Sequence, residues 1–206
     1  MLFAVKNRLT PTLILSLVFI AVSLAAKSAL GLTWGLEPYN GIFRDVIIAS
    51  GVIIGSDMGI SLILVLIFHT AYVRYYMRFV NYFRPQGVYQ ILAAGFIAGT
   101  EELIFRGVIL EGLVSVLNIE TAYAVLITGV IFGLCHAIPK RNAALFNVWA
   151  VWEGIVLGAV YVLSGSLLVC VIVHAVHDIL GYALFALQRK RGFSLRNINT
   201  GFLDSL

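Results

Sequence analysis

The segment ILAAGFIAGTEELIFRGVIL, residues 91–110, is apolar enough to lie in a membrane yet carries three charged residues. Two acids, Glu101 and Glu102, are adjacent, and Arg106 follows the second at a spacing of four. On insertion scales a charge near the bilayer centre costs at least ~2.5 to 3.5 kcal/mol, so such a group needs a compensating role. We therefore expect a helix that holds a functional polar site inside the bilayer.

The composition of the whole chain agrees with a membrane environment. Of its 206 residues 61% are hydrophobic and only 12% are charged, and the mean hydropathy is +0.99, which excludes an ordinary soluble domain. Two cysteines provide neither a disulfide framework nor a zinc-finger spacing. The net charge of +4 comes without the aromatic and basic pattern of nucleic-acid binding. We expect one integral membrane domain over residues 1–206, with membrane lipids as partners and no nucleic acid.

Apolar runs of the length that crosses a ~30 Å hydrocarbon core predict an all-α, polytopic bundle of about six transmembrane helices. Two of these runs are too long for one untilted helix, so each tilts, extends beyond the membrane, or breaks at Gly55-Ser56-Asp57 or at Gly99-Thr100. The six expected spans are residues 11–30, 45–73, 88–117, 121–138, 144–162 and 166–187.

The distribution of basic residues predicts the orientation. With the N-terminus inside, most of the 14 Lys and Arg residues fall in cytoplasmic segments, as the positive-inside rule requires. Both termini are then cytoplasmic, and the basic segments face anionic lipid.

The charged motif has a physical interpretation. Residues four apart share a helix face, so Glu102 and Arg106 form an ion pair, and Glu101 points about 100° away without a local partner. A carboxylate in such a site suits a general base, which makes Glu101 the predicted base. The competing interpretation is that Glu101, Glu102 and Arg106 form a buried ionic cluster that fixes helix packing.

Two histidines occupy later spans at similar spacings. Phe132 precedes His136 by four residues, and His174 precedes Asp178 by four, so each pair lies on one helix face. A single intramembrane histidine is about as often a helix-helix hydrogen-bonding residue as a catalytic one. Two histidines and Glu101 on three helices favour catalysis, because imidazole can hold a water or donate to a developing oxyanion.

The motifs Glu-Glu-x-x-x-Arg, Phe-x-x-x-His and His-x-x-x-Asn or Asp, in this order, resemble the signature of the CPBP family. This family comprises the CAAX prenyl endopeptidases and bacteriocin-processing enzymes, also called the Abi family, and the resemblance covers about residues 88–187. It implies a glutamate-type intramembrane endopeptidase in which Glu101 activates the attacking water, His136 orients it, and His174 with Asp178 stabilises the oxyanion. Glu102, Arg106 and Phe132 are then supporting residues.

Asp178 departs from the family pattern, which has Asn in the best-characterised members. An ionised carboxylate cannot donate to an oxyanion. Either Asp178 is protonated, or it orients His174, and we favour the second role because carboxylates commonly fix an imidazole tautomer. We expect no cofactor and no metal. The alternative is a catalytic zinc ion on Glu101, His136 and His174.

Other polar residues in the spans have simpler interpretations. We interpret Asp57, His69 and Glu111 as structural and His177 as a packing or interfacial residue, whereas Glu153 lies beside small residues and is a candidate for lining the substrate path. The two histidines are expected at different depths in the membrane. His136 is about 6 Å along a helix from Lys140 at the cytoplasmic end, whereas His174 is about 22 Å from Arg189. Both can meet Glu101 only if helices tilt or a loop folds inward.

These sequence features are compatible with two functions. The first is an intramembrane endopeptidase acting on a membrane-associated peptide or protein, with or without a lipid modification. The second is a non-catalytic membrane protein on the same fold that binds a partner in signalling or bacteriocin immunity. The short loops and compact length lead us to expect a prokaryotic cell membrane.

Overall fold

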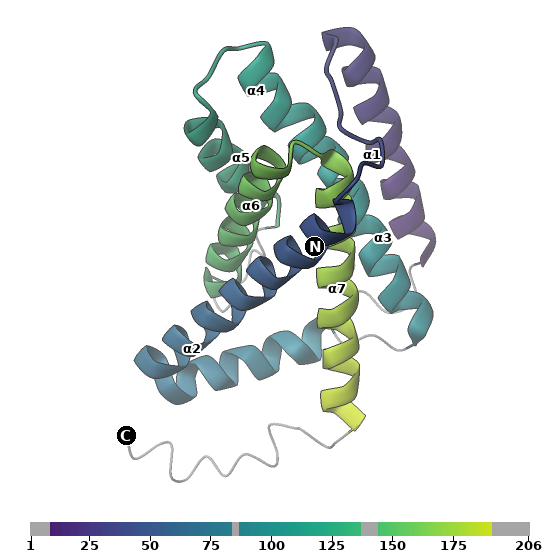
Figure 1. Cartoon of the computed structure of the whole chain (residues 1–206). Helices are drawn as coiled ribbons and strands as arrows, with labels where there is room; N and C mark the ends of the chain where they lie inside the picture. Colours follow the sequence, from purple (N-terminus) through teal and green to yellow (C-terminus); the bar gives the residue numbers. More distant parts are fainter. Residues whose placement is uncertain (1–8, 84–86, 137–143, 191–206) are drawn as a thin grey trace.

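The computed structural model describes residues 9–83, 87–136 and 144–190, and these residues form helices joined by short connections, with no strand among them (Figure 1). The predicted all-α fold is confirmed. In chain order the elements are α1 (Leu9–Leu30), α2 (Ile42–Phe83), α3 (Val88–Ile104), the π-helix η1 (Phe105–Leu110), α4 (Glu111–Ser115), α5 (Thr121–Cys135), α6 (Ala144–Ser164) and α7 (Leu167–Lys190).

Five helical stretches are long and apolar enough to cross a membrane, and α5 is a shorter apolar helix. Together they correspond to the six expected spans. Their outward surfaces carry many exposed large apolar side chains, among them Leu17, Phe43 and Leu163, as lipid contact requires. The chain is an integral membrane protein. The basic residues at 140–141 and in the chain ends lie outside the described residues, so the orientation stays a prediction.

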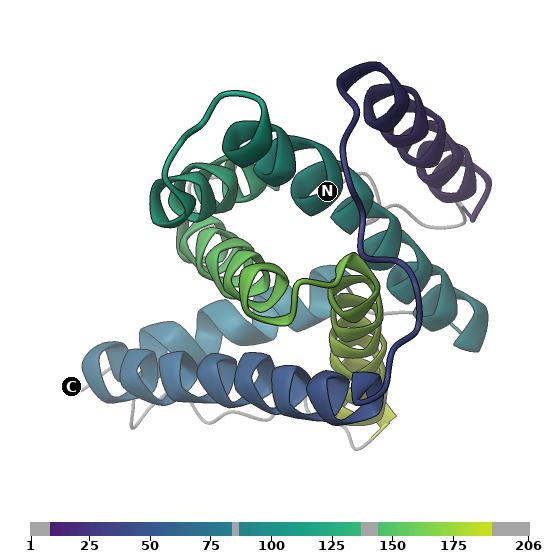
Figure 2. The ribbon, with the colours of Figure 1, turned by 45° about the horizontal axis from the view of Figure 1, so that its top comes forward.

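The bundle is built on two closely packed helix pairs. Helix α3 packs along α7, and α5 packs along α6; α1 lies outside against α3, and α2 crosses α7 (Figure 2). Glycines make the close approach possible: a Cβ on Gly129 or Gly133 of α5 would lie 2.9 or 2.8 Å from backbone nitrogens of α6, and one on Gly95 of α3 would lie 2.9 Å from the Ala175 carbonyl oxygen. Small residues at a spacing of four are the usual means of bringing membrane helices together.

Helix α2 is bent at His69, which has φ 41° and ψ −115°. The segment after the bend turns back toward α7 in Figure 1, where the Tyr76 ring meets Phe185 edge to face at 6.4 Å. Tyr72, just after the bend, donates to the Ser61 hydroxyl at 3.1 Å. One alternative from sequence was a break at Gly55-Ser56-Asp57, but those residues are helical, and the prediction of that position is wrong.

The third expected span changes pitch just after the two acids. Residues Phe105–Leu110 form a π-helix, and the backbone N–H of Glu111 bonds to the carbonyl of Arg106, five residues back. The break at Gly99-Thr100, one alternative from the sequence, is absent, because both residues lie within α3. Trp34, from the loop between α1 and α2, donates its indole N–H to the Gly107 carbonyl at 2.7 Å. Single π-helical turns often occur at functional sites, and this one lies directly beside the charged motif.

Candidate active site

Glu101 and His136 meet at the junction of α3 and α5. Glu101 lies near the C-terminal end of α3, and His136 is the residue that follows α5. Their nearest polar atoms, Glu101 Oε2 and His136 Nε2, are 3.5 Å apart, and the two side chains are 9% and 18% exposed. This separation is longer than a hydrogen bond and short enough for one water to contact both atoms.

The other nitrogen of His136 fixes the ring. Nδ1 lies 2.8 Å from the Phe132 carbonyl oxygen, which can only accept, so Nδ1 carries a proton and donates it. In neutral imidazole Nε2 is then an acceptor. The spacing of four between Phe132 and His136 therefore has two effects. It places the two rings on one helix face, and it directs the basic Nε2 of His136 toward Glu101.

Glu102 is held in a different way from its neighbour. It is fully buried, and its Oε1 accepts from Arg106 Nη1 at 2.8 Å and from His174 Nδ1 at 2.6 Å. Arg106, also fully buried, donates from Nη2 to the Gly154 carbonyl at 2.6 Å. The expected Glu102 and Arg106 pair is present, and its contacts join α3 and η1 to α6 and α7.

The Phe132 ring lies at the centre of these groups. It stacks on His136 at 4.2 Å, packs beside His174 at 5.8 Å, and lies 5.1 Å from the Arg106 guanidinium. The Phe105 ring packs against the Phe132 ring edge to face, with the ring centroids 4.8 Å apart. Both histidines thus lie against one aromatic ring. Glu101 and the two histidines therefore come together despite the conflict of depth expected from the sequence, and His136 does so as the residue that follows α5.

Asp178 does not have the partner expected from sequence. The carboxylate that orients His174 is Glu102, whereas Asp178 lies beside His177, with Oδ1 3.5 Å from Nδ1. The interpretation that Asp178 orients His174 is therefore wrong. The physical reason is the packing of α3 against α7. Glu102 of α3 lies at the level of His174, and its carboxylate occupies the position next to His174 Nδ1.

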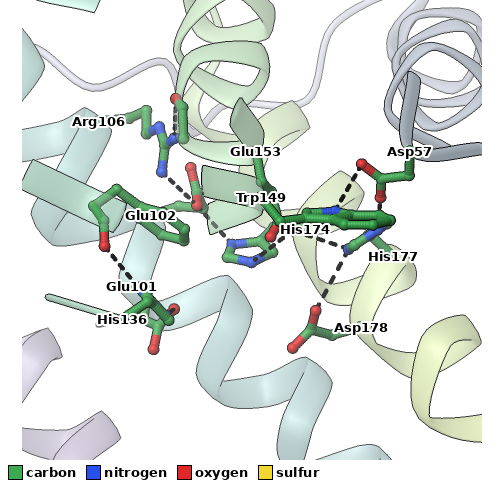
Figure 3. Close-up of polar contacts among 12 residues, drawn as sticks. Asp57, Glu101, Glu102, Arg106, His136, Trp149, Glu153, His174, His177 and Asp178 are labelled. Carbon is green, nitrogen blue, oxygen red and sulfur yellow. Dashed lines mark hydrogen bonds and ion pairs between the residues drawn. The ribbon is translucent and has the colours of Figure 1, made fainter. Parts of the chain in front are cut away.

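A second polar cluster adjoins the first on the side of α2 (Figure 3). His177 Nε2 lies 2.6 Å from Asp57 Oδ2, and His177 Nδ1 lies 3.0 Å from Glu153 Oε1. Trp149 also donates to Asp57, at 3.1 Å. The sequence predicted a structural role for Asp57 and a packing or interfacial role for His177. Neither residue alone indicates a function. The feature of the sequence that could have predicted this cluster is that α2, α6 and α7 each carry an ionisable residue in mid-span.

Glu153 connects the two clusters. Its Oε1 is 3.0 Å from His177 Nδ1 and 3.6 Å from His174 Nε2. The zinc ligands considered from sequence, Glu101, His136 and His174, are not the set whose ligand atoms converge. Among the described residues, that set is Glu153, His177 and Asp178, with one ligand atom from each within 4.8 Å of the others.

The sequence matches a known protein family over part of its length. Residues 83–180 match the family model described as Rce1-like, the type II CAAX prenyl endopeptidases. The matched region contains the site residues of α3, α5, α6 and α7 and excludes Asp57 of α2. The chain matches no curated protein and no solved structure.

Proposed function

We propose that this chain is an intramembrane endopeptidase that hydrolyses a peptide bond with water activated by Glu101. The premise is the match of residues 83–180 to the Rce1-like family of CAAX proteases. The substrate is a membrane-associated peptide or protein. The family relationship supports protease activity in general. The choice of Glu101 as the base rests on the geometry of the site.

The observation that carries the proposal is the open contact between Glu101 and His136. The two acceptor atoms, 3.5 Å apart, can each accept one hydrogen of the same water, which orients the water oxygen toward a substrate carbonyl. Glu101 then takes a proton as the oxygen attacks, and it returns that proton to the leaving amine when the C–N bond breaks. General acid–base catalysis of this kind contributes about 10²- to 10⁴-fold to a rate.

His174 is the proposed donor to the oxyanion. Its Nδ1 is engaged by Glu102, so it donates from Nε2 only as the imidazolium ion. Glu102 and Arg106 hold the ring in place as positioning residues. We assign no donor role to Asp178, whose contact is with His177.

A non-catalytic scaffold on the same fold remains the second candidate, and one observation favours it. Glu102, Arg106 and His174 are bound to one another inside the protein, as a purely structural ionic cluster would be. Glu101 and His136 are not joined in this way, and a scaffold gains nothing from a buried and a partly buried acceptor that face each other 3.5 Å apart.

The experiment compares membrane-associated and secreted peptides from native cells that carry wild type or Glu101→Gln at matched expression. We expect peptides that are truncated only in wild-type cells. The control is Glu111→Gln, because Glu111 is an intramembrane acid that contacts Tyr161 and lies away from the proposed base. Identical peptide profiles in wild-type and Glu101→Gln cells would instead favour the scaffold.

A further inference from the structure

The cluster on the α2 side of the site contains more acceptors than the proposed hydrolysis uses. His177 has a carboxylate against each ring nitrogen: Asp57 lies at Nε2, and Glu153 and Asp178 lie at Nδ1. Figure 3 shows the three acids converging on this one ring. One imidazole cannot neutralise three carboxylates, and in a membrane protein an uncompensated charge is costly.

The proton of His177 is best placed on the Asp57 side. Nε2 and Asp57 Oδ2 are 2.6 Å apart and form a hydrogen bond, and Trp149 holds the other oxygen of Asp57. Nδ1 of His177 and Oε1 of Glu153 are 3.0 Å apart, but both are fully buried atoms without a hydrogen-bond partner among the described residues. Two buried acceptors at this distance repel each other unless a positive charge lies between them.

The spacing of these atoms fits a metal ion. Ligand atoms that lie ~2.1 Å from a tetrahedral zinc ion are about 3.4 Å apart. The two distances from His177 Nδ1, 3.0 Å to Glu153 and 3.5 Å to Asp178, lie on either side of that value. Asp57 occupies the position of the carboxylate that commonly orients a metal-bound histidine through its other nitrogen.

His174 provides an independent indication on the opposite side of Glu153. This side chain is 4% exposed, and its Nδ1 is bound to Glu102. Its other nitrogen, Nε2, therefore faces Glu153 Oε1 at 3.6 Å, beyond hydrogen-bond length. Two histidines, each held by a carboxylate through one nitrogen, thus direct the remaining nitrogen at the same oxygen.

We propose that Glu153, His177 and Asp178 bind a divalent transition-metal cation of the zinc class, with Asp57 orienting His177 and His174 Nε2 bordering the site. The mixed nitrogen and oxygen ligands favour zinc over magnesium or calcium, which prefer oxygen ligands alone. The ion links α6 to α7 directly and to α2 through Asp57. The proposal goes beyond the proposed function, because binding at this site does not require that Glu101 is a base.

The test uses the full chain purified in detergent with an affinity tag that lacks histidine, stripped with a chelator and titrated with Zn²⁺ alone. We expect one zinc per chain by elemental analysis and a rise in the thermal unfolding temperature that magnesium and calcium do not produce. Both effects should be lost in His177→Gln and weakened at least tenfold in Asp178→Asn, which keeps the side-chain size at a partly exposed position.

Two controls make the result decisive. Glu101→Gln should bind zinc like wild type, because Glu101 is outside the ligand set, whereas equal loss in Glu101→Gln and Asp178→Asn would place the ion elsewhere and overturn the proposal. Asp45→Asn removes a remote carboxylate of α2 that contacts Tyr39 and Arg44, and it should also bind normally. Absence of zinc binding by folded wild type would overturn the proposal and show that a proton alone supplies the positive charge.

Discussion

Glu101 and Glu102 are adjacent residues with opposite surroundings. Glu102 is fully buried and bonded to Arg106 and His174, whereas the polar contact of Glu101 is a histidine at 3.5 Å. The rotation of about 100° between neighbours in a helix produces this division. One acid faces the helix junction and stabilises it, and the other faces the end of α5 and remains available for proton transfer.

The buried ion pair should depend on both partners. The variant Arg106→Gln leaves the Glu102 carboxylate buried without the guanidinium that pairs with it. We therefore expect the free energy of unfolding to fall by about 3–5 kcal/mol. Thermal unfolding in detergent measures this change. The double variant Glu102→Gln with Arg106→Gln should recover part of the loss. A double variant less stable than Arg106→Gln would contradict the ion-pair account.

The Phe132 ring should matter more for chemistry than for folding when its volume is conserved. Phe132→Leu fills most of the space but removes the face on which His136 stacks, so we expect a reduced kcat with an unfolding temperature close to that of wild type. The measurement is the cleavage rate at matched folded concentration. Wild-type kcat in this variant would show that the backbone contact to the Phe132 carbonyl orients His136 by itself.

At the residue scale helical spacing predicted the Glu102 and Arg106 pair, and the family resemblance predicted that Glu101 and His136 meet. The sequence did not predict the partner of Asp178 or the contacts of His177. The contacts of His177 depend on how α2 and α6 pack against α7, and the absence of Asp178 from His174 depends on Glu102 of α3. Both are set by packing between helices far apart in the sequence.

At the scale of elements, the pairing of α5 with α6 brings Phe132 and Gly154 together. A Cβ on Gly133 would lie 2.8 Å from the Val151 backbone nitrogen, so the helices have to separate to accept it. We expect Gly133→Ala to lower the free energy of unfolding by about 1–3 kcal/mol. We also expect slower cleavage, because moving α6 away from α5 displaces Gly154, whose carbonyl accepts from Arg106.

The matched control for this change is Gly59→Ala. Gly59 is helical and exposed, and a Cβ at this residue would have no neighbouring atom within 4 Å, so alanine should be neutral or stabilising by up to ~1 kcal/mol. Both variants are compared by thermal unfolding in the same detergent. Equal unfolding temperatures for the two alanine variants would argue against close packing of α5 on α6.

The position of the bend in α2 is the structural feature that the sequence predicted least well. Gly55 suggested a break by its residue type, but the helix runs through it and bends at His69, where a residue other than glycine adopts a positive φ. Nothing in the residue pattern indicated the π-helix at Phe105–Leu110. Tertiary contacts accompany both features. Tyr72 and Tyr76 make theirs just after the bend in α2, and Trp34 donates to Gly107 within the π-helix.

At the scale of the whole molecule, the orientation in the membrane is open to direct measurement. In a variant with Cys135→Ser and Cys170→Ser, single cysteines are introduced as Asn7→Cys, Asn40→Cys and Ser205→Cys and tested with a membrane-impermeant maleimide on intact cells. The positive-inside rule predicts labelling at Asn40→Cys alone, with the two others labelled only after permeabilisation. Labelling of either terminal cysteine in intact cells would contradict cytoplasmic termini.

The proposed mechanism requires that Glu101 acts as the base in peptide-bond hydrolysis. The most direct measurement is the cleavage rate of one membrane-associated peptide by purified wild type, Glu101→Gln and Glu111→Gln, each shown to have the same unfolding temperature. We predict that Glu101→Gln loses about 10²- to 10⁴-fold in rate and that Glu111→Gln cleaves like wild type. A Glu101→Gln protein that is folded and cleaves at the wild-type rate would contradict this mechanism.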